Sequence, residues 1–426
     1  MTNITSESPI KAANPLLSVL SIRDFQLLWF GGTTSMLGSQ FAMIALPWLV
    51  LQLTGDPLAL GIVLGLAGIP RTIFMLFGGA IADRFSPRMI LVICDWINFA
   101  LSALIAVLVF TGQMQVWMLY VFSLVTGLLS GFVMPAASSI LPSVVPDDKL
   151  QTANSISMGS QQLVGFVGPA LAGIIIGANS QSTLGIVVAF VVDALTFGIS
   201  AVALGLMRNG NGQAVQPNEN ILLSLWESGV YLWNHGTLRY MFTIMAAVNF
   251  LFTGPLLVGI PVLAEQRLSE GATAFGLLMT AYAGGNLAGM ILAGVLPKPT
   301  GERFRILMIA LLIGFGIVLA SFGWITNTWI NFALILTLGL GNGYFGLVLF
   351  TWIQQRTPRE MLGRVMSMVM LASMGLVPLS QIVSGVISRS DLTLLFVSSG
   401  GLILLTTLWA AFQPALKLLS NEMVGE

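Results

Sequence analysis

The sequence predicts an all-α integral membrane protein in which twelve transmembrane helices form two pseudo-symmetric six-helix bundles. Of its 426 residues, 56% are hydrophobic and 8% are charged, and the mean hydropathy is +0.91. A soluble chain carries about 25% charged residues, so this chain lacks the charge that a water-facing surface needs. Its apolar residues also gather in long runs, which are typical of helices that cross a bilayer.

Each predicted span is an apolar run of roughly 20 or more residues, the length that crosses a hydrocarbon core about 30 Å thick. The first run is too long for the apolar core of a signal peptide, and the polar segment before it has no basic start. We therefore expect no cleaved targeting segment. The spans are predicted at residues 27–53, 58–82, 89–110, 116–141, 152–177, 184–207, 238–263, 272–296, 305–325, 329–352, 362–388 and 392–415.

The basic residues are distributed unevenly between the two sides of these spans. When successive loops alternate in side, fourteen of the 17 basic residues share the side of the N-terminus, Arg267 and Arg389 lie on the other, and Arg71 lies within a span. Because Lys and Arg are enriched in cytoplasmic loops, this split predicts that both termini are cytosolic. We expect a multi-pass protein of the plasma membrane, here a bacterial inner membrane.

The chain divides into two similar halves. Residues 1–207 and 238–426 each hold six predicted spans. The polar segment 208–237 between them predicts a cytosolic linker, and its second part could form an amphipathic helix on the membrane surface. Short features recur in both halves at nearly one offset, for example Leu46-Pro47 with Ile260-Pro261, which indicates an internal duplication.

The composition excludes several kinds of function. Equal numbers of acidic and basic residues leave no basic excess for nucleic acid. A single cysteine, Cys94, and a single histidine, His235, exclude a Cys-ligated or His-ligated metal site. The sequence contains no Walker-type phosphate loop and no pair of nucleophile and base, so we expect no cofactor, no metal and no enzymatic activity.

The turn after the second span carries a recognisable pattern. Gly79, Asp83, Arg84 and Arg88 fit Gly-x-x-x-Asp-Arg-x-x-x-Arg, which resembles motif A of the major facilitator superfamily. Asp83 could face the N-terminus of a helix of the other half, a contact that exists only while the inner side is shut. This interpretation predicts a gate, and the alternative is a tight turn with ordinary inside-positive charge. The matching loop of the second half lacks an Asp-Arg pair.

A second pattern lies in the fifth span. Gly165, Gly168, Pro169 and Gly173 resemble motif C of the exporter branches of this superfamily, although the first spacing is one residue short. Small residues with a proline predict a kinked helix that packs closely against a neighbour. Two further segments, Arg23–Trp29 and 141–154, resemble the branch that holds the enterobactin exporter and the macrolide-efflux pumps.

Three formal charges lie well inside predicted spans, and each costs about 2.5–3.5 kcal/mol at a helix centre unless it finds a partner or a water-filled cavity. Arg71 and Asp95 lie at similar depths, so we hypothesise that they form an ion pair. Asp95 is either such a structural partner or a protonatable coupling site. Asp193 has no basic residue at its depth and is either a proton-exchanging carboxyl or a carboxyl that hydrogen-bonds neighbouring helices.

Uncharged polar residues mark a candidate cavity. In the superfamily that the motifs resemble, the first, fourth, seventh and tenth helices line the cavity, and here three of these helices carry Gln40, Asn249 and Asn342. Such side chains either bind substrate or hold helices together through hydrogen bonds. The fourth span reads Gly127–Gly131 without the arginine that many proton-coupled exporters carry there, so that residue's role cannot be carried over.

We therefore expect a monomeric secondary exporter that works by alternating access and is driven by proton antiport. Its partners would be the lipid bilayer, a small amphipathic substrate such as a siderophore, a macrolide or another drug, and accessory export proteins. The alternative within transport is a lipid flippase or an uncoupled facilitator. A membrane receptor or scaffold is the alternative from another class, and the duplicated halves argue against it.

Overall fold

The structure, a computed structural model, describes residues 15–82, 86–178, 183–210, 229–230, 233–234, 236–297, 299, 301–357 and 361–413. These residues form helices and contain no strand. The elements are α1 (Pro15–Leu20), α2 (Arg23–Thr54), α3 (Pro57–Ala82), α4 (Pro87–Phe110), α5 (Val116–Val144), the 3₁₀ turn η1 (Asp147–Lys149), α6 (Leu150–Gly177), α7 (Leu184–Gly205), α9 (Gly236–Gly254), the π-helical turn η2 (Pro255–Gly259), α10 (Ile260–Arg267), α11 (Ala272–Val295), α12 (Gly301–Ser321), α13 (Thr328–Arg356), α14 (Leu362–Met374), α15 (Val377–Ser390) and α16 (Leu392–Phe412).

Twelve spans of the described residues are long and apolar enough to cross a membrane, which confirms the predicted number. Two of them are interrupted. The seventh consists of α9, η2 and α10, because Pro255 has no N–H to continue the helical ladder. The eleventh is divided into α14 and α15. Ser380 on α15 supports the seventh span, since its hydroxyl accepts a hydrogen bond from Gly254 N–H at 3.0 Å and donates one to Phe250 C=O.

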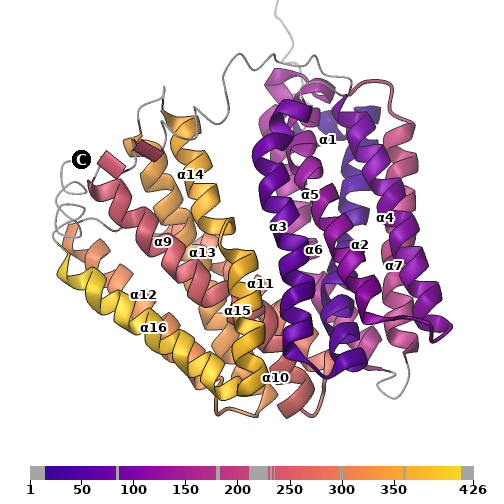
Figure 1. Cartoon of the computed structure of the whole chain (residues 1–426). Coiled ribbons are helices and arrows are strands. Elements are labelled where there is room, and N and C mark those ends of the chain that lie inside the picture. Colours follow the sequence, from indigo (N-terminus) through magenta and orange to yellow (C-terminus); the bar gives the residue numbers. More distant parts are fainter. Residues whose placement is uncertain are drawn as a thin grey trace, which may run out of the picture.

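The helices gather into two groups, α1 to α7 and α9 to α16 (Figure 1). We call the end of the helices that carries α1 and η1 the linker face, and the opposite end, with the turn 54–57 and the loop 268–271, the far face. The two groups touch near the far face and diverge toward the linker face. Most of the predicted linker, residues 211–228, lies outside the described residues.

Glycines of α3 allow one close contact between the halves. A Cβ atom added to Gly61 would lie 2.7 Å from Gln381 C=O and 3.0 Å from Gly385 Cα on α15. One turn further, Gly65 faces Ile382, and then Gly68 faces Pro378, with equally little room. Helices in lipid associate mainly through such van der Waals packing of small residues, so α3 and α15 form one of the two seams that join the halves.

The second seam joins α6 to α11. A Cβ atom on Gly173 would lie 2.7 Å from Gly276 Cα, and Gly177 meets Thr273 in the same way. Thr273 also donates a hydrogen bond to Gly173 C=O at 3.3 Å. Further from the far face, Gln162 contacts Met290 across this seam. The halves are therefore held together at the far face by backbone-to-backbone packing.

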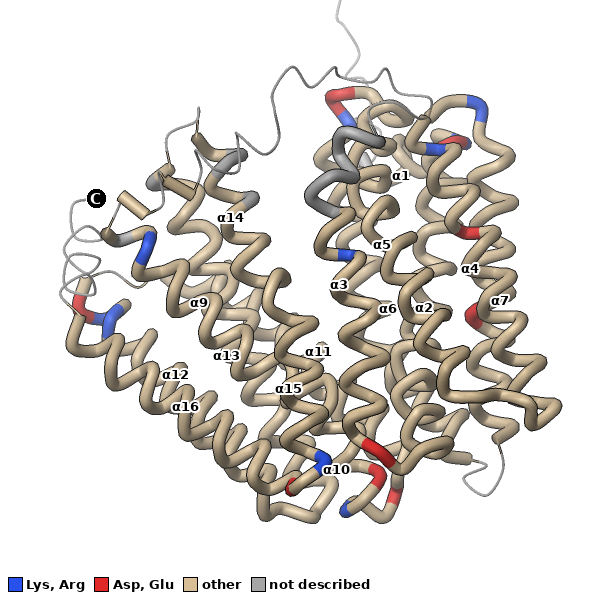
Figure 2. The backbone as a smooth tube through the Cα atoms, viewed as in Figure 1, with Lys and Arg blue, Asp and Glu red and all other residues tan. Residues whose placement is uncertain are grey.

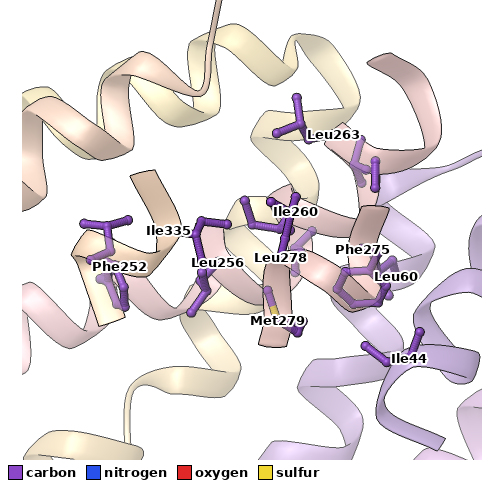
Figure 3. Packing of buried hydrophobic residues seen from close by; sticks show 14 of the residues in the cluster. Ile44, Leu60, Phe252, Leu256, Ile260, Leu263, Phe275, Leu278, Met279 and Ile335 are labelled. Atoms are coloured by element: carbon purple, nitrogen blue, oxygen red, sulfur yellow. The ribbon is translucent and has the colours of Figure 1, made fainter. Parts of the chain in front are cut away.

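Buried hydrophobic side chains continue across the junction. Ile44 of α2 and Leu60 of α3 belong to the same cluster as Phe275 and Leu278 of α11 and Ile260 of α10 (Figure 3). Trp48 on α2 lies against the loop of the other half, because a Cβ atom on Gly271 would be 3.3 Å from its ring. The contact between the halves at the far face therefore includes buried hydrophobic side chains as well as closely packed helix backbones.

Charged residues mark the ends of the helices. Figure 2 shows acidic and basic residues mainly at the linker face and the far face, with few between them. This distribution agrees with the span assignment, because a charge is costly in the hydrocarbon region. The basic residues concentrated at the linker face predict that this face lies in the cytosol.

The α3–α15 seam leads to a first prediction. Gly61→Val should open the far face, because overpacking costs about 1–3 kcal/mol only while the seam is closed. A Ser388→Cys reporter, placed at a buried far-face position in a Cys94→Ser background, should then react with a charged maleimide about 10-fold faster. Gly165→Val is the matched control, since nothing lies within 4 Å of a Cβ atom there. Equal labelling in both variants would contradict the packing argument.

Candidate functional site

The C-terminal half contains a cavity of about 290 Å³ between helices of the seventh, ninth, tenth and eleventh spans. Its wall is mainly Phe, Met, Leu, Ile and Val side chains, and no charged residue of the described chain lines it. Two aromatic rings of the wall, Phe252 and Phe315, stack with centroids 5.7 Å apart. The lining residues are Met241, Ile244, Met245, Val248, Asn249, Phe252, Phe315, Asn342, Phe345, Gly346, Leu349, Phe350, Ile353, Val369, Met370 and Ser373.

Two asparagines and Ser373, whose hydroxyl donates to Val369 C=O at 2.8 Å, supply the polar side chains of this cavity. Asn249 on α9 donates through its amide nitrogen to Met245 C=O at 2.9 Å, which leaves its side-chain oxygen as an acceptor. Asn342 on α13 accepts a hydrogen bond from Asn286 on α11 at 2.9 Å, which leaves its NH₂ group as a donor. The structure thus places both predicted residues in one cavity, each held by a neighbour. Gln40, the third predicted residue, lies elsewhere, on α2 of the other half.

The far face carries an ion pair between the halves. Asp56 precedes α3 and accepts a hydrogen bond from Leu58 N–H at 2.9 Å, so it caps that helix. Its carboxylate also lies 3.6 Å from Nε of Arg389, in the last turn of α15. The Arg389 side chain is 62% exposed, and that of Asp56 is 30% exposed, so solvent screens the attraction. One acidic residue therefore both begins an N-terminal helix and contacts the C-terminal half.

Sequence reasoning missed this pair. The available signal was that Arg389 is one of only two basic residues assigned to the outer side, where Lys and Arg are otherwise depleted. The other, Arg267, stays within its own half, where it donates to Gly323 C=O at 2.6 Å and to Thr393 Oγ1 at 2.9 Å. Arg267 therefore joins α10 to the beginning of α16.

The predicted gating motif is only partly visible. Asp83 and Arg84 lie outside the described residues, and Gly79 lies in α3 at a position whose surroundings are not described. Arg88 donates to Leu204 C=O at 2.8 Å and to Gly205 C=O, so it caps the C-terminal end of α7 within its own half. The gating role of the motif stays a prediction.

The exporter-like motif on α6 faces two neighbours. Gly168 packs against the Gln40 side chain of α2, because a Cβ atom there would lie 2.6 Å from Gln40 Cβ. Gly173 packs against Gly276 of the other half, whereas Gly165 has open space around it. Pro169 lies inside the helix, which nevertheless continues from Leu150 to Gly177. The motif therefore joins the N-terminal bundle to the seam between the halves.

The three intramembrane charges are placed apart. The hypothesised pair of Arg71 with Asp95 is not among the ion pairs of the described residues, and Asp95 is buried on α4, which packs against α7. Arg71 is half-buried on α3. Asp193 on α7 is 2% exposed and accepts a hydrogen bond from Ser102 on α4 at 2.6 Å. The prediction of an Arg71–Asp95 ion pair was wrong because it used only the depth of the two residues in the membrane and not the helix that each residue faces.

The two six-helix halves, the seams at one end and the internal cavity define a multi-pass membrane transporter rather than an enzyme. The chain belongs to the Major Facilitator Superfamily, whose sequence pattern matches residues 28–380. It is 24% identical to "Macrolide efflux protein A" of Streptococcus pyogenes over 395 residues, which cover 89% of this chain and 93% of that protein.

Two further similarities agree with this assignment. The "Staphyloferrin A transporter" of Staphylococcus aureus is 26% identical over 357 residues, covering 82% of this chain and 86% of that protein. A crystal structure of the peptide transporter POT in complex with sulfate superposes with a TM-score of 0.71 at 14% identity, covering 96% of this chain and 100% of that one. At this identity the structural likeness shows the fold alone.

A second prediction concerns the ion pair between the halves. Asp56→Asn keeps an N-cap but removes the charge, so the far face should lose about 0–1 kcal/mol and the Ser388→Cys reporter should label at most about fivefold faster. Arg389→Gln should have the same effect, and the double variant should add nothing further. Additive effects of the two substitutions would show that the residues act independently.

A third prediction concerns pH at the same face. The Thr328 hydroxyl donates to Glu270 in the loop 268–271, and this hydrogen bond lowers the pKa of the Glu270 carboxyl below its usual range. In the unfolded chain the carboxyl has a pKa of about 4.3. Because its pKa is lower in the folded chain, the ionised carboxylate stabilises the folded state above about pH 4.3. This stabilisation is lost as the pH falls through the pKa of the folded chain. Thr328→Val should therefore lower Tm at pH 7 and have a smaller effect below about pH 4. A difference that did not change with pH would refute the assignment.

Proposed function

We propose that the chain is a secondary exporter of small amphipathic molecules that works by alternating access and exchanges its substrate for protons. The two halves rock about the far-face seams, and no bound cofactor takes part. The substrate enters from the linker face, and the uneven distribution of basic residues supports a cytosolic position of this face in a bacterial inner membrane. The chain functions as a monomer in the lipid bilayer, and accessory export proteins receive its substrate.

The observation that carries the proposal is the cavity of the C-terminal half in a conformation with a packed far face. The glycine seams and the Asp56–Arg389 pair lie at the far face, whereas the halves diverge toward the linker face (Figure 1). This is the conformation in which an exporter would load substrate from the cytosol. The similarity to "Macrolide efflux protein A" supports the same direction.

The cavity favours one substrate class among the candidates. Its wall offers apolar contact, one acceptor on Asn249 and one donor on Asn342, and it lacks a charged partner. A multiply charged anion would lose its hydration there without compensation. The wall also contains four phenylalanine rings, and aromatic rings attract a single cationic amine. Neutral or singly cationic amphipathic molecules, such as macrolides, therefore fit better than a siderophore with several carboxylates.

An efflux assay in a bacterial host that lacks its own drug pumps tests the proposal. The probes are erythromycin, the lipophilic cation ethidium and the carboxylate siderophore staphyloferrin A. Expression of the chain should lower the accumulation of the first two, and a protonophore should abolish the difference. Equal accumulation of every probe with and without the chain would overturn the proposal. Movement of a fluorescent phospholipid that persists with protonophore would instead indicate a flippase or an uncoupled facilitator.

A fourth prediction tests the two cavity amides. Asn249→Leu and Asn342→Leu should each raise the erythromycin concentration for half-maximal transport about 2–10-fold, because one hydrogen bond contributes about 0.5–1.5 kcal/mol. Asn98→Leu is the matched control, since Asn98 is a half-buried residue of α4 outside the cavity. A loss of equal size in the control would show that the cavity amides have no special role.

A further inference from the structure

A row of polar residues runs along the contact of α4 with α7. On α4 the residues Arg88, Asp95 and Ser102 recur every seventh position, which places them on one face about 10 Å apart. Arg88 contacts the carbonyls at the end of α7, and Ser102 donates a hydrogen bond to Asp193 of α7. Asp95, between them in the row, is buried. The α4–α7 contact therefore contains two buried carboxyl groups.

The Asp193–Ser102 pair leaves a carboxyl oxygen without a partner. Ser102 donates to Oδ2 of Asp193 at 2.6 Å, and both residues are 2% exposed. The other oxygen, Oδ1, is buried and has no hydrogen bond from any described residue. Thr196 does not supply one, because its hydroxyl donates to the backbone carbonyl of Asp193 at 2.8 Å. Gly38 of α2 closes the site, since a Cβ atom there would lie 3.0 Å from Oδ1.

A second buried carboxyl, Asp95 of α4, and a buried hydroxyl, Ser200 of α7, lie nearer the linker face. Asp95 is 7% exposed and Ser200 is 1% exposed. A Cβ atom added to Gly31 of α2 would lie 3.3 Å from Ser200 Oγ. Gly31 and Gly38 are seven residues apart, so α2 presents one glycine to Ser200 and another to Asp193.

Among the described residues, no cation forms an ion pair with either carboxyl. The helices packed against α7 are α2, α4 and α6. Between Phe25 and Thr54, α2 contains no titratable residue, α6 contains none, and α7 contains only Asp193. On α4 the titratable groups are Arg88, Cys94 and Asp95, and Arg88 is occupied at the linker-face end of α7. An ionised carboxylate with an unpartnered oxygen in such surroundings is costly, whereas a neutral acid is tolerated.

We infer that Asp193, hydrogen-bonded to Ser102 and covered by Gly38, is a proton-binding site that is occupied in this conformation. Release breaks the carboxyl O–H bond and transfers the proton to water, leaving a carboxylate. Water can reach that carboxylate only if α2 separates from α7. The coupling of this step to transport rests on the proposed function, but the proton occupancy does not.

The position of α2 connects this site with the junction of the halves. Gln40 on α2 packs against Gly168 of α6, and α6 packs through Gly173 against Gly276 of the other half. A shift of α2 away from Asp193 would therefore disturb a helix that forms one of the two seams. Loss of the proton would loosen the far-face junction, and binding of the proton would favour its closure.

Infrared spectroscopy of the purified full-length chain tests proton occupancy without any substrate. The wild-type chain at pH 7 should show the carbonyl stretch of a neutral carboxylic acid, and Asp193→Asn should weaken it. Ser102→Ala should shift its frequency through loss of the hydrogen bond. Asp56→Asn is the control and should leave the band unchanged, because Asp56 is partly exposed and ion-paired. Absence of the band in the wild type, or a band that Asp193→Asn does not change, would overturn the inference.

Transport in liposomes tests the coupling, with erythromycin as the probe. Asp193→Asn keeps the shape of the neutral acid, so it should retain exchange of erythromycin across the membrane and lose the acceleration by an imposed pH gradient. Gradient-driven transport that persists in Asp193→Asn would remove the coupling role. Absence of erythromycin transport in every chain, with the infrared band present, would overturn the proposed function and leave the proton site standing.

Discussion

The close approach of helix backbones at the far face is the contact on which the arrangement of the two halves depends. In lipid, the hydrophobic effect does not drive helices together, so association relies on dense packing. Gly61 against Gly385 and Gly173 against Gly276 bring backbones together where any side chain would collide. These contacts depend steeply on distance, so they are either made or lost. A junction of this kind suits a protein with two distinct arrangements of its halves better than a protein that deforms continuously.

The two halves carry different polar features around that junction. The N-terminal half holds the Asp193–Ser102 hydrogen bond between α7 and α4, covered by α2, whereas the C-terminal half holds the apolar cavity with Asn249 and Asn342. The interrupted helices also belong to the C-terminal half, where Ser380 satisfies backbone groups beside the π-helical turn. The polar groups of the two halves therefore differ although both are built from six spans.

The sequence indicated some features of the candidate site and missed others. Asn249 and Asn342 line one cavity, whereas Gln40, named for the same reason, does not, and their role in binding stays a prediction. Gly173 lies at a close helix contact. The Arg71–Asp95 pair is not formed among the described residues, since equal depth in a membrane does not make two residues neighbours. The Asp56–Arg389 pair and the Asp193–Ser102 hydrogen bond were missed, because each joins residues from helices that are distant in the chain.

Composition and periodicity alone establish the membrane class, the twelve spans and an uneven distribution of basic residues, because these depend on how each segment interacts with lipid and water. They also show that Arg88, Asp95 and Ser102 share one face of a helix. Only the packing of helices decides that this face meets α7 rather than lipid, and that Asp193 finds a hydroxyl instead of a cation. A helix pattern identifies which residues point the same way, whereas tertiary contacts determine what they meet.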